Sequence, residues 1–259
     1  MVRLSFLLLM LFVGRALSQA ATSVASQFSL STSTTLPFPQ ATLDSSSTQS
    51  YINSKWGLSN GRIQTGASNL EFVNDPFANA ATPGATNSSA SGPVLQVQYP
   101  AGSYRNDNTG GAQFYAMWNS NGSTSAFQSM LVTYEVAFQA DFDWVKGGKL
   151  PGLRGGPDQN DCSGGNQPDG TNCFSTRVMW RTNGAGEGMF VPFHAGALHG
   201  EFSCCVWKVY AYVPRVNGTC SDSGVECNDE YGISLNRGSF VFASGQCASY
   251  LLFSPCGYR

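Results

Sequence analysis

The chain has 259 residues, with 14 lysines and arginines against 16 aspartates and glutamates, and a formal net charge of −2. This balance, a sequence pI of about 5.6 and the lack of a long basic run argue against nucleic acid as a partner. The length fits one large all-β domain, and beyond the N-terminus no apolar stretch approaches the roughly 18 to 20 residues of a membrane helix, which argues against a membrane partner.

The N-terminal residues have the pattern of a secretory signal peptide. A positive start at Arg3 precedes a short apolar run from Leu4 to Val13, and small residues follow near Ser18. Such a run is too short to span a bilayer and is typical of a cleaved export signal. We therefore expect residues 1–18 to be removed and the mature protein to be secreted, extracellular and soluble.

The next stretch, residues 19–50, is rich in Ser and Thr and poor in large apolar side chains. This composition predicts a low-complexity segment in which no core forms. Residues 51–259 are then expected to form a single β domain, with its first strands in short apolar pieces between residues 53 and 72.

Alternating patterns predict further strands at residues 94–100 and 130–138. The second places four side chains on one face: Val132, Tyr134, Val136 and Phe138. No window shows helical periodicity, while 29 glycines and 12 prolines punctuate the strand patterns. The expected fold is all-β, an antiparallel β-sandwich of jelly-roll type.

Eight cysteines in an exported chain predict disulfides rather than thiolate metal ligands. Cys162 with Cys173, and Cys220 with Cys227, each close a short loop rich in Gly, Asn and Asp, and are the predicted pairs. Three Asn-x-Ser/Thr sequons predict a glycosylated exterior: Asn87, Asn121 and Asn217.

Positive charge is concentrated within the 36 residues 146–181. Five cations lie there: Lys146, Lys149, Arg154, Arg177 and Arg181. On the strand expected at its end, alternation places Ser175, Arg177, Met179 and Arg181 on one face, opposite Thr176, Val178 and Trp180. We expect this face to bind an anion, with Lys149 held by the turn residues around it; the alternative is a solvated face with two incidental arginines.

A further strand is expected at residues 206–213, with Lys208, Tyr210 and Tyr212 on one face. The two tyrosines could line a binding surface or simply pack against neighbouring strands. His194 and His199 lie outside these patterns and are expected to be incidental.

Five motifs together resemble polysaccharide lyase family 14 over roughly residues 90–245. They are Gly-Gly-Ala-Gln-Phe-Tyr-Ala (110–116), Tyr-Glu-Val-Ala-Phe (134–138), Phe-Asp-Trp-Val-Lys-Gly-Gly-Lys-Leu-Pro-Gly-Leu (142–153), Cys-Phe-Ser-Thr-Arg-Val-Met-Trp-Arg (173–181) and Gly-Ala-Gly-Glu (184–187). The resemblance implies a β-jelly roll that cleaves uronic-acid polymers such as alginate or glucuronan by β-elimination, without a metal or other cofactor. An acidic polysaccharide is then the expected partner, and a monomer the expected state.

Matched residue by residue, the resemblance implies four catalytic residues: Lys149, Arg177, Tyr210 and Tyr212. Substrate binding is assigned to Ser175, Arg181, Gln113 and Lys146. Elimination removes the proton at C5 of a uronate, which requires a cation to neutralise the neighbouring carboxylate, a base and an acid. Arg177 and Lys149 can supply the charge, while either tyrosine, or Lys149 itself, could be the base.

The sequence departs from the family pattern at two places. Residues 189–209 intervene between Gly-Ala-Gly-Glu and the Tyr-x-Tyr strand, and removing these 21 residues restores the pattern. We hypothesise a retained intron or gene-model error, which transcripts coding without interruption through codons 185–213 in every read would reject. After residue 242 the chain continues into a tail, Cys247 to Arg259, that is unrelated to the family pattern. The last strands are therefore expected to be missing and sheet edges to be open.

Two other functions compete with a lyase. A lectin-like module would use the same basic face to bind carbohydrate without turnover. Glycoside hydrolysis needs a pair of carboxylates flanking the bond. The acidic residues near the basic strand, Glu135, Asp141, Asp143 and Glu187, do not form such a paired pattern, so hydrolysis ranks last.

Overall fold

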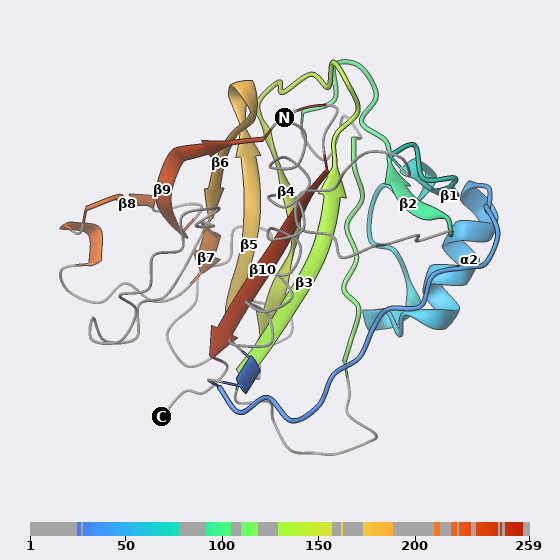
Figure 1. The fold of residues 1–259 in the computed structure, drawn as a ribbon, viewed down its shortest axis with the longest axis horizontal. Coiled ribbons are helices and arrows are strands. Elements are labelled where there is room, and N and C mark those ends of the chain that lie inside the picture. The colour runs from blue at the N-terminus through green and yellow to red at the C-terminus, as the bar shows by residue number, and fades with distance from the viewer. Residues whose placement is uncertain are drawn as a thin grey trace, which may run out of the picture. The chain divides into compact units, whose positions relative to one another are not determined.

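The computed structural model describes residues 25–26, 28–77, 92–104, 110–118, 129–156, 162, 173–188, 210–212, 219–221, 223–228, 232–242, 244 and 247–255. The chain divides into two compact units (Figure 1). We call residues 31–81 and 86–126 the helical unit, and residues 1–30, 82–85 and 127–259 the sheet unit. The single domain expected for residues 51–259 therefore contains two cores, one of which begins before residue 51.

The helical unit contains a helix that the sequence analysis did not predict, α2 (Ser45–Lys55). The Asp44 side chain caps it by accepting a hydrogen bond from the Ser47 backbone N–H at 2.8 Å. Only Thr48 and Ile52 are buried, so the apolar stripe is too narrow to show as helical periodicity. The expectation that no core forms in residues 19–50 is thus wrong for the end of that segment.

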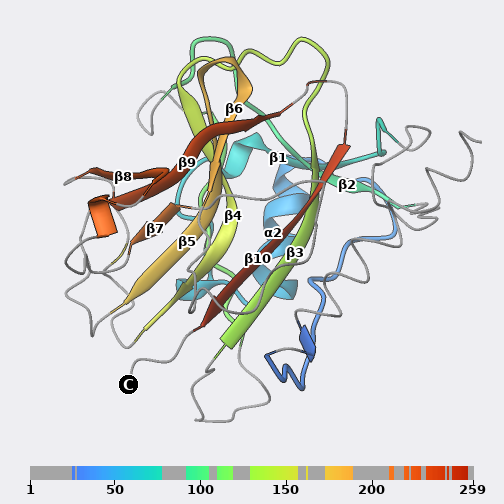
Figure 2. The same ribbon diagram turned by 60° about the vertical axis from the view of Figure 1, so that its left-hand side comes forward.

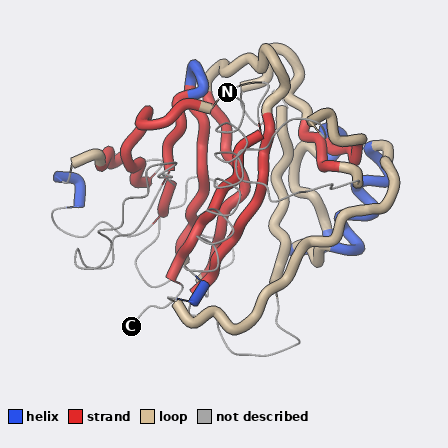
Figure 3. Tube along the Cα trace, in the orientation of Figure 1, coloured by secondary structure: helices blue, strands red, loops and turns tan. Residues whose placement is uncertain are grey.

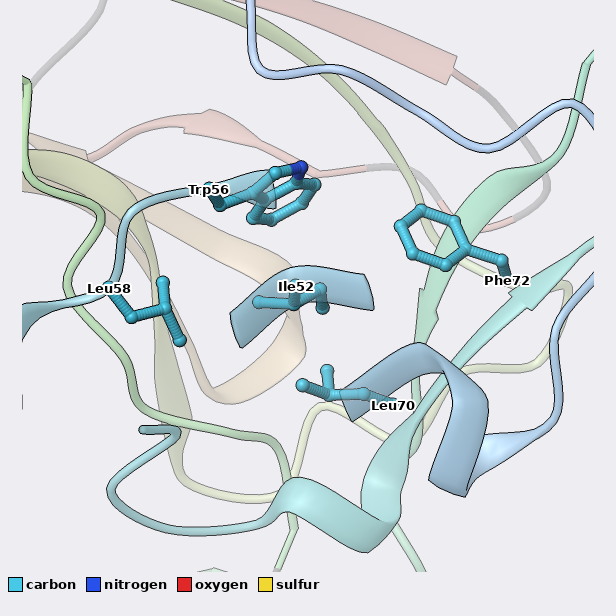
Figure 4. Close-up of a cluster of buried hydrophobic side chains, with 5 residues drawn as sticks. All are labelled: Ile52, Trp56, Leu58, Leu70 and Phe72. Atoms are coloured by element: carbon cyan, nitrogen blue, oxygen red, sulfur yellow. The ribbon is translucent and has the colours of Figure 1, made fainter. Parts of the chain in front are cut away.

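The core of the helical unit joins α2 to a small antiparallel sheet. This sheet pairs β1 (Leu70–Val73) with β2 (Val94–Val97). Figure 4 shows five buried side chains that converge from α2, the turn after it and β1: Ile52, Trp56, Leu58, Leu70 and Phe72. Most of the region expected to hold the first strands is therefore helix and turn, since the apolar side chains there serve a helix-based core. The strand predicted at residues 94–100 is confirmed over residues 94–97, as β2.

The strands of the sheet unit, drawn red in Figure 3, pair antiparallel. A two-stranded sheet pairs β3 (Ser129–Ala137) with β10 (Cys247–Pro255). A six-stranded sheet contains β4 (Gly147–Gly155), β5 (Phe174–Arg181), β6 (Ala185–Gly188), β7 (Tyr210–Tyr212), β8 (Val225–Asn228) and β9 (Gly232–Val241). Within it β5 is central, since β4 pairs with one edge and both β6 and β7 pair with the other.

The two sheets of this unit share an aromatic core. Its buried members are Phe138, Val178, Trp180 and Phe242. Val132, Tyr134 and Val136 of β3 pack against them, so the predicted inward faces of β3 and β5 are confirmed. The Phe138 ring lies 4.5 Å from that of Trp144 and 5.4 Å from that of Trp180, measured between centroids. This packing holds β5 by one face and leaves its other face for the cations.

The tail after residue 246, which does not match the family pattern, forms a strand. β10 pairs with β3 along its whole length, from Cys247 opposite Ala137 to Pro255 opposite Ser129. Figure 2 shows the two strands side by side. The tail therefore pairs with an edge of β3, although no strand was expected there.

The fold is mostly β-strand in antiparallel sheets, which confirms the all-β prediction in its coarse form. The jelly-roll topology stays a prediction. Both predicted disulfides are formed, Cys162–Cys173 and Cys220–Cys227. Among the described residues, no helix is long and apolar enough to span a membrane. The proposed signal peptide and the asparagines of all three sequons lie outside the described residues.

Candidate active site

The outward face of β5 carries the cations that the sequence analysis singled out. Val178 and Trp180 point into the core, so the alternate positions 175, 177, 179 and 181 lie on the opposite face. Ser175 is buried and accepts a hydrogen bond from the Arg177 guanidinium. Met179 is also buried, against the Cys162–Cys173 disulfide. Along this face Arg177 and Arg181 therefore lie on either side of the apolar Met179 side chain.

Lys149 reaches this face from the neighbouring strand. It lies opposite Met179 in the β4–β5 ladder, and paired residues in an antiparallel ladder share a face. The register shifts between Lys149 and Gly152, and a Cβ at Gly152 would lie 1.9 Å from the Thr176 carbonyl oxygen. The Lys-Leu-Pro-Gly sequence thus forms an irregular stretch, and only glycine fits at position 152. Lys149, opposite Met179, lies between the positions of Arg177 and Arg181 on β5.

The environment lowers the pKa of Lys149 below its usual 10.5. Although the residue as a whole is solvent-exposed, partial desolvation is the largest cause, followed by the positive charges of Arg177 and Arg181. Both effects disfavour the ammonium form. Lys149 therefore loses its proton at a lower pH than an ordinary lysine, so the neutral amine needed for a base forms more readily.

A labelling experiment can measure this pKa. The rate of Lys149 acylation, followed by peptide mass spectrometry, should reach its half-maximum at a pH below the usual value of 10.5. Arg177→Gln removes one of the two neighbouring charges, so the midpoint should move to higher pH without returning fully, because desolvation remains. A midpoint that Arg177→Gln leaves in place would contradict the electrostatic coupling. Labelling of Lys55, an exposed residue at the end of α2, in the same samples controls for the reactivity of the reagent.

The two tyrosine positions lie beside Ser175 and Arg177. In the β5–β7 ladder Tyr212 is opposite Ser175, and Tyr210 is opposite Arg177. Backbone register therefore puts both tyrosine positions on the cationic face. Of the strand predicted at residues 206–213, β7 is the part within the described residues.

The register also bears on the segment that interrupts the family pattern. Met179 pairs with Glu187 of β6, and Arg177 pairs with Tyr210 of β7. Glu187 and Tyr210 are 23 residues apart in the chain, whereas their partners on β5 are only two residues apart. A continuous strand would need only two residues for this step, so the chain contains 21 residues more than the pairing requires. That number equals the length of segment 189–209. β6 and β7 thus pair with β5 in the register that one continuous strand without segment 189–209 would have. Segment 189–209, with both histidines, lies outside the described residues.

A buried carboxylate lies beside the cations. Glu187 is fully buried, and its two oxygens bind different partners. Oε1 accepts from Arg181 Nε at 2.6 Å and forms an ion pair with the same guanidinium. Oε2 accepts from Arg237 Nε at 2.6 Å and from the Ser234 hydroxyl at 2.9 Å. The predicted substrate-binding residue Arg181 is therefore held by an acid.

The two remaining residues assigned to substrate binding, Lys146 and Gln113, lie outside β5. Lys146 is exposed immediately before β4. Gln113 lies in the helical unit, where its amide donates to the Gln64 side chain at 2.8 Å. The register adds Arg154, which lies opposite Ser175 on the same face as Arg177. Arg154 is one of the five clustered cations but has no role in the sequence-based assignment, because the bulge in β4 changes which residues share a face.

Comparisons with known proteins agree with the resemblance drawn from the motifs. Residues 87–198 match the family model of polysaccharide lyase 14. The crystal structure of the marine PL-14 alginate lyase from Aplysia kurodai is similar, with a TM-score of 0.55 and 26% sequence identity. That match covers 85% of this chain and 70% of the other. No curated protein matches the chain. The resemblance is confirmed, and both findings support a polysaccharide lyase.

Proposed function

We propose that this chain, which matches the polysaccharide lyase 14 family over residues 87–198, is a secreted lyase. Its substrate would be a uronic-acid polymer of alginate or glucuronan type, cleaved by β-elimination. The observation that carries the proposal is that Lys149 and Arg177 lie on one sheet face, next to the backbone positions of Tyr210 and Tyr212 in the β5–β7 ladder.

The residues fit the requirements of the reaction. A uronate carboxylate placed at Arg177 would have its charge neutralised, which acidifies the proton at C5. A base, either Lys149 or one tyrosine, takes that proton, and the C5–H electrons form the C4–C5 double bond. The C4–O bond breaks, and an acid, one of the tyrosines, protonates the departing oxygen. Ser175, fixed by its hydrogen bond with Arg177, would orient the sugar.

An absorbance assay tests the proposal. The product contains a double bond conjugated to a carboxylate, so ultraviolet absorbance should rise when the protein is mixed with alginate or glucuronan. Binding of either polymer with no rise in absorbance would instead support the lectin-like alternative. No binding and no rise with any polyuronate would contradict both.

Removing residues 189–209 should preserve or increase this activity. The deletion joins Gly188 directly to Tyr210 and keeps the pairing of both strands with β5. The absorbance assay should therefore give a rate for the shortened chain at least equal to that of the full chain. An inactive but folded shortened chain would mean that the segment contributes to the site. The full chain assayed in parallel is the control.

A further inference from the structure

We propose that Glu187 is a positioning residue of this site, which fixes the Arg181 guanidinium beside Lys149 and is itself held by Arg237 of β9, the strand next to its own. The inference rests on the proposed function and deepens it, since the motif match assigned no role to Glu187. The acid belongs to β6, the cation that it fixes belongs to β5, and the second anchor belongs to β9.

The contacts of Glu187 leave its carboxylate little freedom. Its side chain has no exposed surface, whereas those of Arg181 and Arg237 are 29% and 43% exposed. One oxygen serves Arg181, and the other serves Arg237 and Ser234. A buried carboxylate that accepts several charge-assisted hydrogen bonds is held rigidly, and it holds its partners in turn.

The register shows why this clamp matters for the reacting groups. Lys149, Met179 and Glu187 lie at one level on three successive strands, β4, β5 and β6. Adjacent strands are about 4.8 Å apart, so Met179 separates the amine of β4 from the acid of β6. Arg181, two positions along β5 from Met179, contacts the acid and acts electrostatically on Lys149. Glu187 therefore affects the amine through Arg181.

Fixing Arg181 serves the chemistry of an elimination. Negative charge develops on the uronate as its proton leaves, and a cation helps most when it is already in place and need not reorganise. A long side chain such as Arg has many rotamers. With Glu187 clamping one end of its guanidinium, Arg181 presents a positive charge to the site in a single arrangement.

A double-mutant cycle tests whether Glu187 acts through Arg181. Glu187→Gln keeps the shape of the side chain but removes its charge, and it should lower kcat roughly 10- to 100-fold with a much smaller change in KM. In an Arg181→Gln background the same substitution should add less than threefold, because the group that it positions is already gone. Glu226→Gln is the matched control. Glu226 also binds Arg237, at 3.1 Å, but is 56% exposed, so kcat should stay within twofold.

Several results would overturn the inference. One is an unchanged kcat in a folded Glu187→Gln variant, and another is an equal effect of Glu187→Gln in both backgrounds. If Glu187→Gln does not fold, Ser234→Ala removes one hydrogen bond to the same carboxylate and should lower kcat several-fold, so an unchanged kcat there would also count against it. If the unaltered chain forms no unsaturated product, the proposed function fails. In that case the double-mutant cycle is measured with the Kd for alginate in place of kcat. Glu187→Gln should raise this Kd in the chain with Arg181 but not in the Arg181→Gln background.

Discussion

Arg177→Gln is expected to lower kcat/KM for a polyuronate about 100- to 1000-fold, the usual loss when a preorganised group that stabilises a developing oxyanion is removed. Arg177 lies opposite the Tyr210 position and contacts Ser175, so its guanidinium is placed to neutralise the substrate carboxylate. Glutamine keeps hydrogen-bonding capacity but no charge. The rate is followed by the ultraviolet absorbance of the unsaturated product.

Two variants sharpen this prediction. Arg177→Lys keeps the charge but loses the bidentate fork, and should give an intermediate rate. Arg62→Gln removes an exposed arginine of the helical unit and should leave the rate unchanged. If Arg177→Gln lowers the rate no more than Arg62→Gln does, Arg177 does not perform the proposed neutralisation.

Phe138→Ala is expected to lower the free energy of unfolding of the sheet unit by about 3 to 5 kcal/mol. Phe138 is buried in the core that β3 and β5 share, and its ring contacts those of Trp144, Trp180 and Phe242. Removing it leaves a cavity behind the strand that carries Ser175 and Arg177. Denaturant-induced unfolding measures the change.

The control for this prediction lies in the same unit. Val241 is 66% exposed, and Val241→Ala should change the free energy of unfolding by less than about 0.5 kcal/mol. Similar losses for the two variants would show that the aromatic cluster does not stabilise this unit.

The parts of the site on β5 could be predicted from the sequence because they depend on alternation alone. Side chains on a strand point alternately to its two faces, so Arg177 and Trp180 fall on opposite faces whatever surrounds them. The pair Cys162–Cys173 was also predictable, since a short polar loop brings its ends together. These features need no knowledge of distant contacts.

Features that depend on distant contacts were missed. α2 has only two buried residues. It is stabilised by the Asp44 cap and by the hydrogen bond that the Thr48 hydroxyl accepts from the Phe72 backbone N–H, neither of which produces a periodic pattern. Glu187 was visible in Gly-Ala-Gly-Glu, but its partner Arg237 is 50 residues further along the chain. No local pattern indicates that pair. The bulge in β4 likewise hid the place of Arg154 on the cationic face.

The fate of solvent oxygen tests most directly whether an amine and a guanidinium on this face promote elimination. The protein is incubated with alginate or glucuronan in water enriched in heavy oxygen, and the new chain ends are weighed by mass spectrometry. Elimination forms the double bond from the substrate's own electrons, so we predict products without solvent oxygen whose masses sum to that of the starting chain. Products whose masses together exceed that of the starting chain by one water per cleaved bond, with the heavy isotope incorporated, would show hydrolysis and contradict the account.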